Sequence, residues 1–538
     1  MIIALCQINP TVGAIANNKK KHLDWYNKAV ASGADLIVFP ELSLIGYPPQ
    51  DLLYRNQFLI EAEKALNDIV SHINIPTIIG SVYKKESNLF NSCYLIEKQI
   101  IKSIYKKILL PTYDIFDEDR YFTSGSDSIV ESIRVGKDLI PIGFQICEDL
   151  WDDDYGKDLT GRLKKNGAEL IINISASPYK VKKLKERYDL IKKKINKYNI
   201  PYLYCNLVGA QDEIIFDGQS LAFNQDGELL ASGKPFEEEM ILVDTANKNY
   251  FKLNDYKREE ELFNALVLGV KDYFKKSNHE EAVIGISGGI DSAITSVIAE
   301  SALGPSNVHG VYMPSKFSSS ISKIDSKKLA DNLDIDFRVM PINDLVLSFE
   351  KTLDNSFEGL EPGIAEENIQ SRIRGVILMA LSNKFGWLVL STGNKTEMAL
   401  GYCTLYGDMS GGLSVISDLS KSDVYSIANW INIDRGREVI PLNTLTRLPT
   451  AELAYDQYDP FDYEIVSPLV SMLIEESKSP KELVKMGYSK KLVKDISNRI
   501  RVNEYKRRQS APGLKVTSKA FGVGRRVPII NQFEEIKK

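Results

Sequence analysis

The chain has 538 residues, of which 43% are apolar and 26% are charged, and its formal net charge is −5. At about 150 residues per domain the chain is too long for one ordinary domain, and its composition excludes a disordered or fibrous protein. A small negative charge gives no global indication of nucleic-acid or membrane-surface binding. We therefore expect a globular protein of at least two domains, with no nucleic-acid and no membrane partner.

The five cysteines are few, odd in number and widely spread: Cys6, Cys93, Cys147, Cys205 and Cys403. No CxxC pair occurs, so the pattern predicts neither a zinc site nor a disulfide framework, and it favours a reducing compartment. The first residues lack the charged head and apolar core of a signal peptide, and no apolar run approaches ~18 residues. We expect a cytoplasmic protein.

The first half of the chain alternates short strands with amphipathic helices. After an N-terminal strand over 1–8, the predicted strands are 36–39, 77–80, 142–146, 170–174 and 202–205. The lysine-rich stretch 182–197 predicts a helix, and a solvated helix face is favoured there over a basic binding surface.

Charged residues with little periodicity fill positions 226–261, as in connections between domains. A helix over 262–273, a strand over 281–286, a helix from about residue 292 and a strand over 308–313 are predicted next. This spacing favours a doubly wound parallel sheet. The predicted division is a first domain over 1–245, a linker over 246–261 and a second domain over 262–538.

The end of the chain is strongly basic. Between residues 499 and 526 there are nine Lys or Arg residues and one acidic residue, Glu504. Such a surface requires an anionic ligand or extensive solvent, and a disordered basic tail is the alternative interpretation.

Three residues suited to amide hydrolysis each follow a predicted strand: Glu41, Lys107 and Cys147. Sites of α/β folds assemble at strand ends. A thiol can attack a carbonyl, a carboxylate can carry its proton to the leaving ammonia, and an ammonium can stabilise the tetrahedral oxyanion. The alternative is that Cys147 is a small core residue, the common fate of a free cysteine.

The strings around these residues resemble the nitrilase (carbon-nitrogen hydrolase) superfamily, in its glutaminase branch. They are Phe39-Pro-Glu41, Lys107-x-x-Leu-Pro-x-Tyr113, Phe116-Asp-Glu-Asp-Arg-Tyr-Phe122, Ile146-Cys-Glu-Asp-Leu-Trp151 and Asn173-Ile-Ser-Ala-Ser-Pro-Tyr179. The resemblance implies an αββα sandwich with Glu41 as general base, Lys107 as oxyanion support and Cys147 as nucleophile. It also implies glutamine contacts from Tyr113, Glu148, Ser177 and Lys183, and a second carboxylate at Glu118.

A glycine-rich turn, Gly285-Ile-Ser-Gly-Gly-Ile-Asp-Ser292, joins a predicted strand to a predicted helix. Glycines let the backbone approach an anion, and backbone amides with the serine hydroxyls can hold phosphate oxygens at the helix N-terminus. Asp291 would repel phosphate unless a divalent cation lay between them, so it predicts magnesium. A purely structural tight turn is the alternative.

The full SGGxDS string resembles the loop of enzymes that split ATP between its α and β phosphates. Further strings resemble the NAD synthetase family: Met313-Pro-Ser, Glu366-Glu-Asn-Ile-Gln-Ser-Arg-Ile-Arg-Gly375, Ser391-Thr-Gly-Asn-Lys-Thr-Glu397, Gly401-Tyr-Cys-Thr-Leu-Tyr-Gly-Asp408, Asp418-Leu-Ser-Lys421, Pro449-Thr-Ala-Glu-Leu453 and Asn503-Glu-Tyr-Lys-Arg507. The resemblance implies a Rossmann-like domain of the ATP-pyrophosphatase type.

This second resemblance also implies binding residues. The implied ATP contacts are Gly285, Ile286, Ser287, Gly288, Gly289, Ile290, Asp291, Ser292, Thr392, Lys421 and Thr450. Magnesium ligands would be Asp291 and Glu397. The implied deamido-NAD contacts are Asn368, Arg372, Lys395, Glu397 and Lys506.

Together the resemblances imply hydrolysis of glutamine to glutamate and ammonia, coupled to adenylylation of deamido-NAD by ATP and displacement of AMP by that ammonia. The expected partners are these small molecules, and a homo-oligomer is expected. Three alternatives remain: an amidotransferase for another acceptor, an amidase with a regulatory nucleotide-binding half, and a scaffold or nucleic-acid protein using the basic tail. The paired carboxylates Asp291 and Glu397 disfavour a half that only binds nucleotide.

Overall fold

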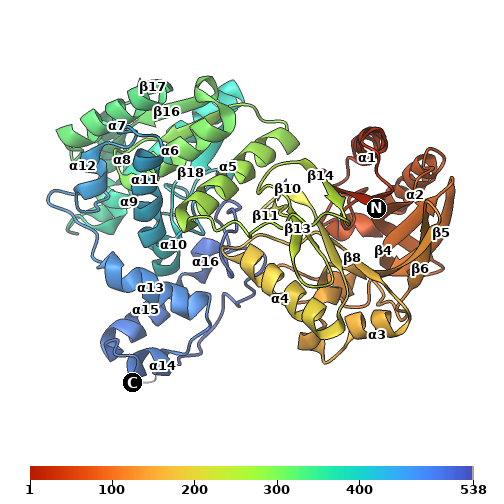
Figure 1. Cartoon of the computed structure of the whole chain (residues 1–538). Helices are drawn as coiled ribbons and strands as arrows, with labels where there is room; N and C mark the ends of the chain where they lie inside the picture. The colour runs from red at the N-terminus through yellow and green to blue at the C-terminus, as the bar shows by residue number, and fades with distance from the viewer. Residues whose placement is uncertain (536–538) are drawn as a thin grey trace. The chain divides into compact units, whose positions relative to one another are not determined.

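The computed structural model describes residues 1–535. The chain divides into two compact units, Met1–Asp255 and Tyr256–Lys538 (Figure 1). Within the described residues, no helix combines the length and the apolar character that crossing a membrane requires.

The first unit contains two six-stranded mixed sheets. One has the order β14-β1-β2-β3-β4-β5 and the other β13-β12-β9-β8-β7-β6. The strands of the first sheet are β1 (Ile2–Gln7), β2 (Leu36–Val38), β3 (Thr77–Lys85), β4 (Asn88–Glu97), β5 (Ile100–Lys106) and β14 (Glu239–Asp244). Those of the second are β6 (Val130–Val135), β7 (Asp138–Ile146), β8 (Leu170–Ser175), β9 (Tyr202–Asn206), β12 (Leu221–Phe223) and β13 (Leu229–Ser232). A separate hairpin consists of β10 (Val208–Gln211) and β11 (Ile214–Asp217).

The alternation of side chains along these strands produces four layers. On β1, Ile3 and Leu5 belong to the apolar core between the sheets, where they join Ile172 of β8. Ala4 and Cys6 point the other way and pack in a second core with helices α1 (Ile15–Ala31) and α2 (Asn56–Val70). Helices α3 (Leu159–Lys165) and α4 (Lys183–Tyr198) lie on the second sheet (Figure 1). The predicted αββα sandwich is confirmed.

The strands predicted in the first half all form, as does the lysine-rich helix α4. The stretch interpreted as a connection from residue 226 onward, however, contains β13 and β14, which are edge strands of the two sheets. β13 is only four residues long and almost wholly buried, so it shows no alternation, and the acidic run at residues 237–239 obscures the alternation of β14. The boundary between the compact units falls at Asp255.

The second unit is built on a five-stranded, fully parallel sheet with the order β17-β16-β15-β18-β19. Its strands are β15 (Ala282–Gly285), β16 (Val308–Tyr312), β17 (Asp336–Val339), β18 (Leu388–Ser391) and β19 (Leu413–Ser414). The order reverses beside β15, so a crevice is expected at the carboxyl ends of β15 and β18. This confirms the predicted Rossmann-like sheet.

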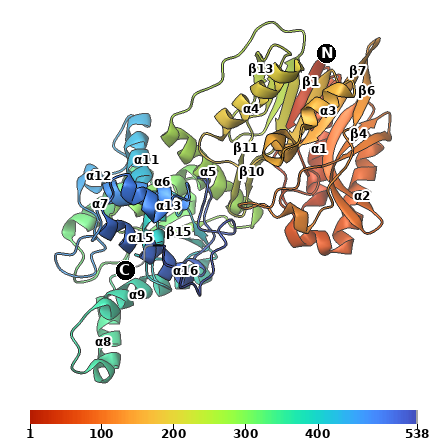
Figure 2. The ribbon, with the colours of Figure 1, turned by 90° about the horizontal axis from the view of Figure 1, so that it is seen from below.

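Helices cover both faces of this sheet. The helices of this part of the unit are α5 (Arg258–Lys276), α6 (Ile290–Leu303), α7 (Ser320–Leu333), α8 (Asn343–Phe357), α9 (Ile364–Phe385), α10 (Lys395–Leu400), α11 (Lys421–Asp434) and α12 (Leu442–Thr446). One core joins β15, β16 and β18 to α8 and α9, which lie against each other (Figure 2). On the other side α5, α6 and α11 are mutual neighbours.

A smaller helical section completes this unit: α13 (Tyr463–Ile474), α14 (Pro480–Lys485), α15 (Lys490–Val502) and α16 (Glu504–Arg507). Short 3-10 helices occur at η1 (Gln50–Tyr54), η2 (Glu118–Arg120), η3 (Cys147–Tyr155) and η4 (Pro305–Asn307).

The basic C-terminal stretch is packed rather than disordered. Glu504 receives Arg507 at 2.9 Å and Arg525 at 2.5 Å, and Val516 is fully buried. Glu504, the one acidic residue of this stretch, thus pairs with cations of the same stretch, and the pairing with Arg525 over 21 residues leaves no local pattern in the sequence.

Candidate active sites

The three residues selected for amide chemistry come together in the first unit. Glu41 follows β2, Lys107 follows β5 and Cys147 follows β7. Lys107 Nζ lies 2.7 Å from Glu41 Oε1 and 2.8 Å from Glu118 Oε1. All four side chains are buried. The structure therefore assembles a thiol, two carboxylates and an ammonium in one place shielded from water.

Two groups that the sequence analysis missed hold Glu41. Asn91 Nδ2 donates to Glu41 Oε1 at 2.7 Å, and the backbone N–H of Ala176 donates to Oε2 at 2.8 Å. A close approach behind this segment requires Gly80, because a Cβ there would lie 2.3 Å from the Pro40 carbonyl oxygen. Backbone amides and neutral amide side chains carry no charge pattern, so spacing alone could not identify them.

The electrostatics of the cluster assign different charge states to its members. Burial lowers the pKa of Lys107, but Glu118 and Glu41 outweigh it, so that the pKa is raised and the ammonium persists at neutral pH. Burial and then Glu41 raise the pKa of Cys147 well above its ordinary value, against the opposing effect of Lys107. The resting thiol is protonated and needs a base before it can attack.

The backbone at Cys147 is also unusual. Its φ of +42° lies in the left-handed region that non-glycine residues rarely adopt. Asp149 supports this turn by accepting the Ile146 N–H at 2.9 Å and the Leu109 N–H at 2.9 Å. One buried carboxylate thus ties the chain after Lys107 to the chain around Cys147.

The predicted glutamine contacts surround this cluster in part. Tyr113 OH lies 3.1 Å from both carboxylate oxygens of Glu148, and Tyr155, which was not predicted, donates to Glu148 at 2.9 Å. Lys183 Nζ lies 4.0 Å from the centre of the Trp151 ring, and burial lowers the pKa of Lys183 to about 8. The remaining candidate, Ser177, is buried.

The protonation of Glu118 predicts a pH-dependent stability. Burial raises the pKa of Glu118 to about 7 against the opposing effect of Lys107, whereas the ordinary value is 4.5. As pH rises from 4.5 to 7, the unfolded chain loses this proton before the folded chain does, so stability falls. The variant Glu118→Gln has no such proton. Its free energy of unfolding relative to wild type should rise by about 2 kcal/mol between pH 5 and pH 8.

Thermal or urea unfolding of both proteins at the two pH values measures this difference. Buried carboxyls that lie away from Glu118 and Lys107 are common to both proteins, so their titration cancels from the difference. A difference between variant and wild type that does not change with pH would contradict the prediction.

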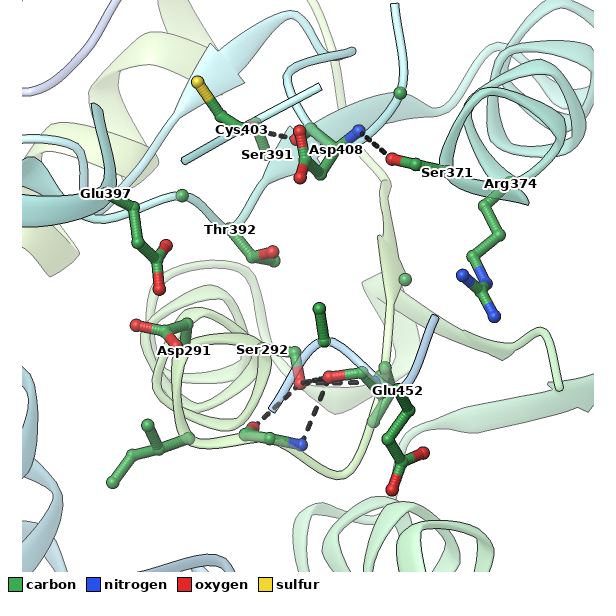
Figure 3. Close-up of a pocket in the computed structure, with 18 of the residues that line it drawn as sticks. Asp291, Ser292, Ser371, Arg374, Ser391, Thr392, Glu397, Cys403, Asp408 and Glu452 are labelled. Atoms are coloured by element: carbon green, nitrogen blue, oxygen red, sulfur yellow. Dashed lines mark hydrogen bonds between the residues drawn. The ribbon is translucent and has the colours of Figure 1, made fainter. Parts of the chain in front are cut away.

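In the second unit a pocket of about 280 Å³ opens at the carboxyl ends of β15, β16 and β18 (Figure 3). Most of the predicted ATP contacts line it: Gly285, Ile286, Ser287, Gly289, Ile290, Asp291, Ser292, Thr392, Lys421 and Thr450. Gly288 is not a lining residue. Its φ is +78° and a Cβ there would lie 2.6 Å from the Ser322 carbonyl oxygen, so the turn itself requires glycine.

Two carboxylates and one ammonium meet on one side of this pocket. Lys421 Nζ lies 2.5 Å from Asp291 Oδ2 and 3.0 Å from Glu397 Oε1, and Figure 3 shows these carboxylates facing each other. Burial raises the pKa of Glu397 to about 7 against the effect of Lys421. For Lys421 burial lowers the pKa, but both carboxylates outweigh it and the net pKa is raised.

Local helix starts place these three side chains. Asp291 is in the first turn of α6, and Lys421 is the first residue of α11, where Ser420 caps the helix through the Asp423 N–H. At α10, Asn394 accepts the Glu397 N–H at 3.1 Å and also donates to Asp291 Oδ1 at 2.8 Å.

Most of the residues predicted to contact deamido-NAD do not line this pocket. Among them only Glu397 lines the pocket. Lys395 is fully buried, with Nζ 2.9 Å from Asp418 and 2.8 Å from Glu475. Lys506 donates to the carbonyls of Gly401 and Cys403. Asn368 accepts a hydrogen bond from the Thr404 hydroxyl, and Arg372 donates to the Leu405 carbonyl.

Several lining residues were not singled out beforehand. Ser371, Arg374, Gly375 and Leu378 line the pocket from one face of α9, at i, i+3, i+4 and i+7, but they are of mixed polarity, so hydrophobic periodicity could not have found that face. Figure 3 shows Arg374 across the pocket from Glu397, and Asp408 and Glu452 also line it. Burial raises the pKa of Asp408 to about 6.

Family models match the two units separately. The carbon-nitrogen hydrolase model covers residues 2–249, and the NAD synthase model covers residues 262–510. A thiol amidase unit and a synthase unit in one chain define an amidotransferase ligase.

Full-length relatives are more specific. The chain is 42% identical to the glutamine-dependent NAD(+) synthetase of Thermotoga maritima and 41% identical to that of a Synechocystis strain, with 99% of each chain covered in both comparisons. The chain belongs to the glutamine-dependent NAD(+) synthetase family.

Solved structures agree with this assignment. The structure of glutamine-dependent NAD+ synthetase from Acinetobacter baumannii in complex with adenosine diphosphate matches with a TM-score of 0.80 and 36% identity, covering 98% of both chains. A glutamine-dependent NAD(+) synthetase from Cytophaga hutchinsonii matches with a TM-score of 0.85 at 23% identity, covering 99% of this chain and 98% of the other, and supports the fold alone.

Proposed function

We propose that the chain converts deamido-NAD to NAD with glutamine as nitrogen donor and ATP as activator. The observation that carries this proposal is the presence, in a chain of this family, of two distinct reactive centres. One is the buried cluster of Glu41, Lys107 and Cys147, and the other is the SGGxDS loop with its pocket.

In the first unit, Glu41 accepts the Cys147 proton as the sulfur attacks the side-chain carbonyl of glutamine. Lys107 stabilises the oxyanion of the tetrahedral intermediate, because its raised pKa keeps it charged. Collapse of that intermediate breaks the C–N bond, Glu41 returns the proton to the leaving ammonia, and a thioester remains. Water activated by Glu41 then releases glutamate and regenerates the thiol.

In the second unit, ATP binds along the loop from Gly285 to Ser292, with its phosphates on the N-terminus of α6. A carboxylate oxygen of deamido-NAD attacks the α-phosphorus and pyrophosphate leaves. Ammonia then attacks the adenylylated carboxyl carbon, so that AMP departs and the carboxamide of NAD is formed. Lys421 holds a positive charge beside these phosphates, and Thr392 and Thr450 supply hydroxyl groups to the same pocket.

Asp291 and Glu397 fit a magnesium ion. Their oxygens already converge on one cation, the Lys421 ammonium, at the edge of the phosphate loop. Magnesium prefers one or two carboxylates together with substrate phosphates and water. Such an ion would neutralise phosphate charge. Within residues 1–535 there is no group of three or more His, Cys, Asp or Glu side chains arranged to hold a metal ion, so the substrate phosphates and water would have to complete the coordination.

The more peripheral assignments stay predictions. These are deamido-NAD binding by Asn368, Arg372, Lys395 and Lys506, glutamine binding by Tyr113, Glu148, Ser177 and Lys183, assembly into a homo-oligomer, and residence in the cytoplasm. In their present arrangement Lys395 and Lys506 already bond protein groups, so a ligand contact requires those bonds to be exchanged.

Product analysis with deamido-NAD, ATP, magnesium and glutamine tests the proposal, with wild type compared with Cys147→Ala. Wild type should form NAD, AMP, pyrophosphate and glutamate. The variant should lose glutamine-driven NAD formation by at least about 10³-fold, because it lacks the nucleophile, and should retain synthesis from ammonium. Glutamate release by wild type without any NAD or AMP would contradict the assignment of the second unit.

A further inference from the structure

A buried ion pair in the first unit lies outside the reaction steps described above. Arg187 projects from the first turns of α4 and is fully buried. Its Nη2 reaches both carboxylate oxygens of Asp217 at the end of β11, one of them at 2.5 Å, and its Nη1 donates to the Gly218 carbonyl at 3.2 Å. The planar guanidinium thus joins Asp217 and the Gly218 carbonyl through two different nitrogens, a geometry that an ammonium does not reproduce.

Asn206, the last residue of β9, connects this pair by hydrogen bonds to the segment beside the reactive cluster. Asn206 Nδ2 donates to the Gly218 carbonyl at 2.8 Å and lies 3.4 Å from Asp217 Oδ1. These bonds fix the amide so that its oxygen faces the Ser177 N–H, which it accepts at 3.0 Å. The orientation of the Asn206 amide therefore depends on the Arg187–Asp217 pair.

Ser177 is adjacent to the group that holds the general base. The preceding N–H, on Ala176, donates to Glu41 Oε2 at 2.8 Å. Two successive backbone amides thus connect Asn206 on one side to Glu41 on the other. A shift of this segment moves the hydrogen bond that orients the Glu41 carboxylate, and displacements of about 1 Å at a reacting group have large effects on rate.

The Arg187–Asp217 pair also contains an arrangement that costs stability. The Nε–H of Arg187 is buried and has no hydrogen-bond partner among residues 1–535, and a buried donor without an acceptor is costly. The Tyr204 ring centre lies 5.7 Å from the guanidinium carbon. Burial lowers the pKa of Arg187, but Asp217, Tyr204 and, more weakly, Cys147 raise it and the net pKa is raised, so the cation lies within electrostatic reach of the nucleophile.

We propose that Arg187 is a positioning residue of the glutaminase centre, acting through Asp217 and Asn206 on the Ser177–Ala176 backbone that orients Glu41. This inference rests on the proposed function of the first unit. Its consequence is a specific kinetic pattern: disruption slows the chemistry at Cys147, whereas synthesis from ammonium in the second unit continues.

Three variants test the inference: Arg187→Lys, which keeps the charge but loses the planar group that reaches both Asp217 and Gly218, Asn206→Ser, and the double variant. Each single variant should lower kcat for glutamine hydrolysis about 10-fold with KM changed less than about threefold, and should leave ammonium-driven NAD formation within twofold of wild type. Because both residues act through one connection, the double variant should lose little more than either single variant. Alkylation of Cys147 by iodoacetamide should slow in parallel.

Ile191→Ala is the matched control, because it removes a fully buried apolar side chain from the same helix that makes none of the hydrogen bonds of this network. It should lower the melting temperature but preserve the glutamine-to-ammonium rate ratio. Equal losses with both nitrogen sources, a ratio like that of Ile191→Ala, or multiplicative losses in the double variant would overturn the inference. Wild type that releases no glutamate would instead refute the proposed function.

Discussion

The variant Lys107→Met is expected to lose glutamine-driven NAD formation by about 10³-fold or more, while ammonium-driven synthesis continues. A fixed positive charge beside a developing oxyanion contributes on the order of 10²–10³ in rate. Removing Lys107 also leaves Glu41 and Glu118 buried together without their common cation. Two such carboxylates repel each other, which also disturbs the placement of Glu41. Steady-state release of glutamate and of NAD measures both effects.

Loss of folding is the competing explanation for that result. Breaking a buried ion pair costs about 3–5 kcal/mol when one charge is left uncompensated. The double variant Lys107→Met/Glu118→Gln removes one of the two carboxylates and should recover much of the melting temperature. It should not recover glutamine hydrolysis, since the oxyanion still lacks its cation. Full recovery of hydrolysis would contradict the role given to Lys107.

The variant Lys421→Met is expected to reduce NAD formation by about 10³-fold with either nitrogen source. Lys421 neutralises Asp291 and Glu397 at 2.5 and 3.0 Å, so its loss leaves two negative charges facing the site predicted for the triphosphate. Release of AMP and pyrophosphate should fall in step with NAD. The Cys147 centre lies in the other unit and should still react with iodoacetamide at the wild-type rate.

Lys421→Arg is the matched variant for this prediction. It keeps the charge and can pair with both carboxylates, but its longer, planar group displaces the contact. We expect it to restore the melting temperature lost in Lys421→Met and only part of the synthesis rate. Wild-type synthesis by Lys421→Met with ammonium would exclude Lys421 from ATP activation.

Local sequence was sufficient for features that depend on neighbouring residues. The side-chain patterns of buried strands and amphipathic helices repeat over a few residues, so most of the predicted strands and helices of both units form where expected. The turns that carry Cys147 and Asp291 are also local, since each directly follows a strand. The family strings around them implied the chemistry that we propose for the two centres.

The contacts that the sequence could not predict are those that join distant segments. Arg187 pairs with Asp217, which lies 30 residues away in the sequence. Lys395 is buried against Asp418 and Glu475 and does not line the pocket. A charged residue has the same local pattern whether it faces a ligand or a buried counter-ion. Only the packing of α4 on its sheet, and of the C-terminal segment beneath α10, decides between them.

The sequence by itself therefore determined the two-unit organisation, the αββα and parallel-sheet folds and the residues that identify the family. The tertiary structure alone decided which polar groups hold Glu41, which face of α9 lines the pocket, and that Arg507 and Arg525 pair with Glu504. The physical reason is the range of the interactions. Periodicity and turn chemistry act over a few residues, whereas the pairing of buried charges depends on how whole layers pack.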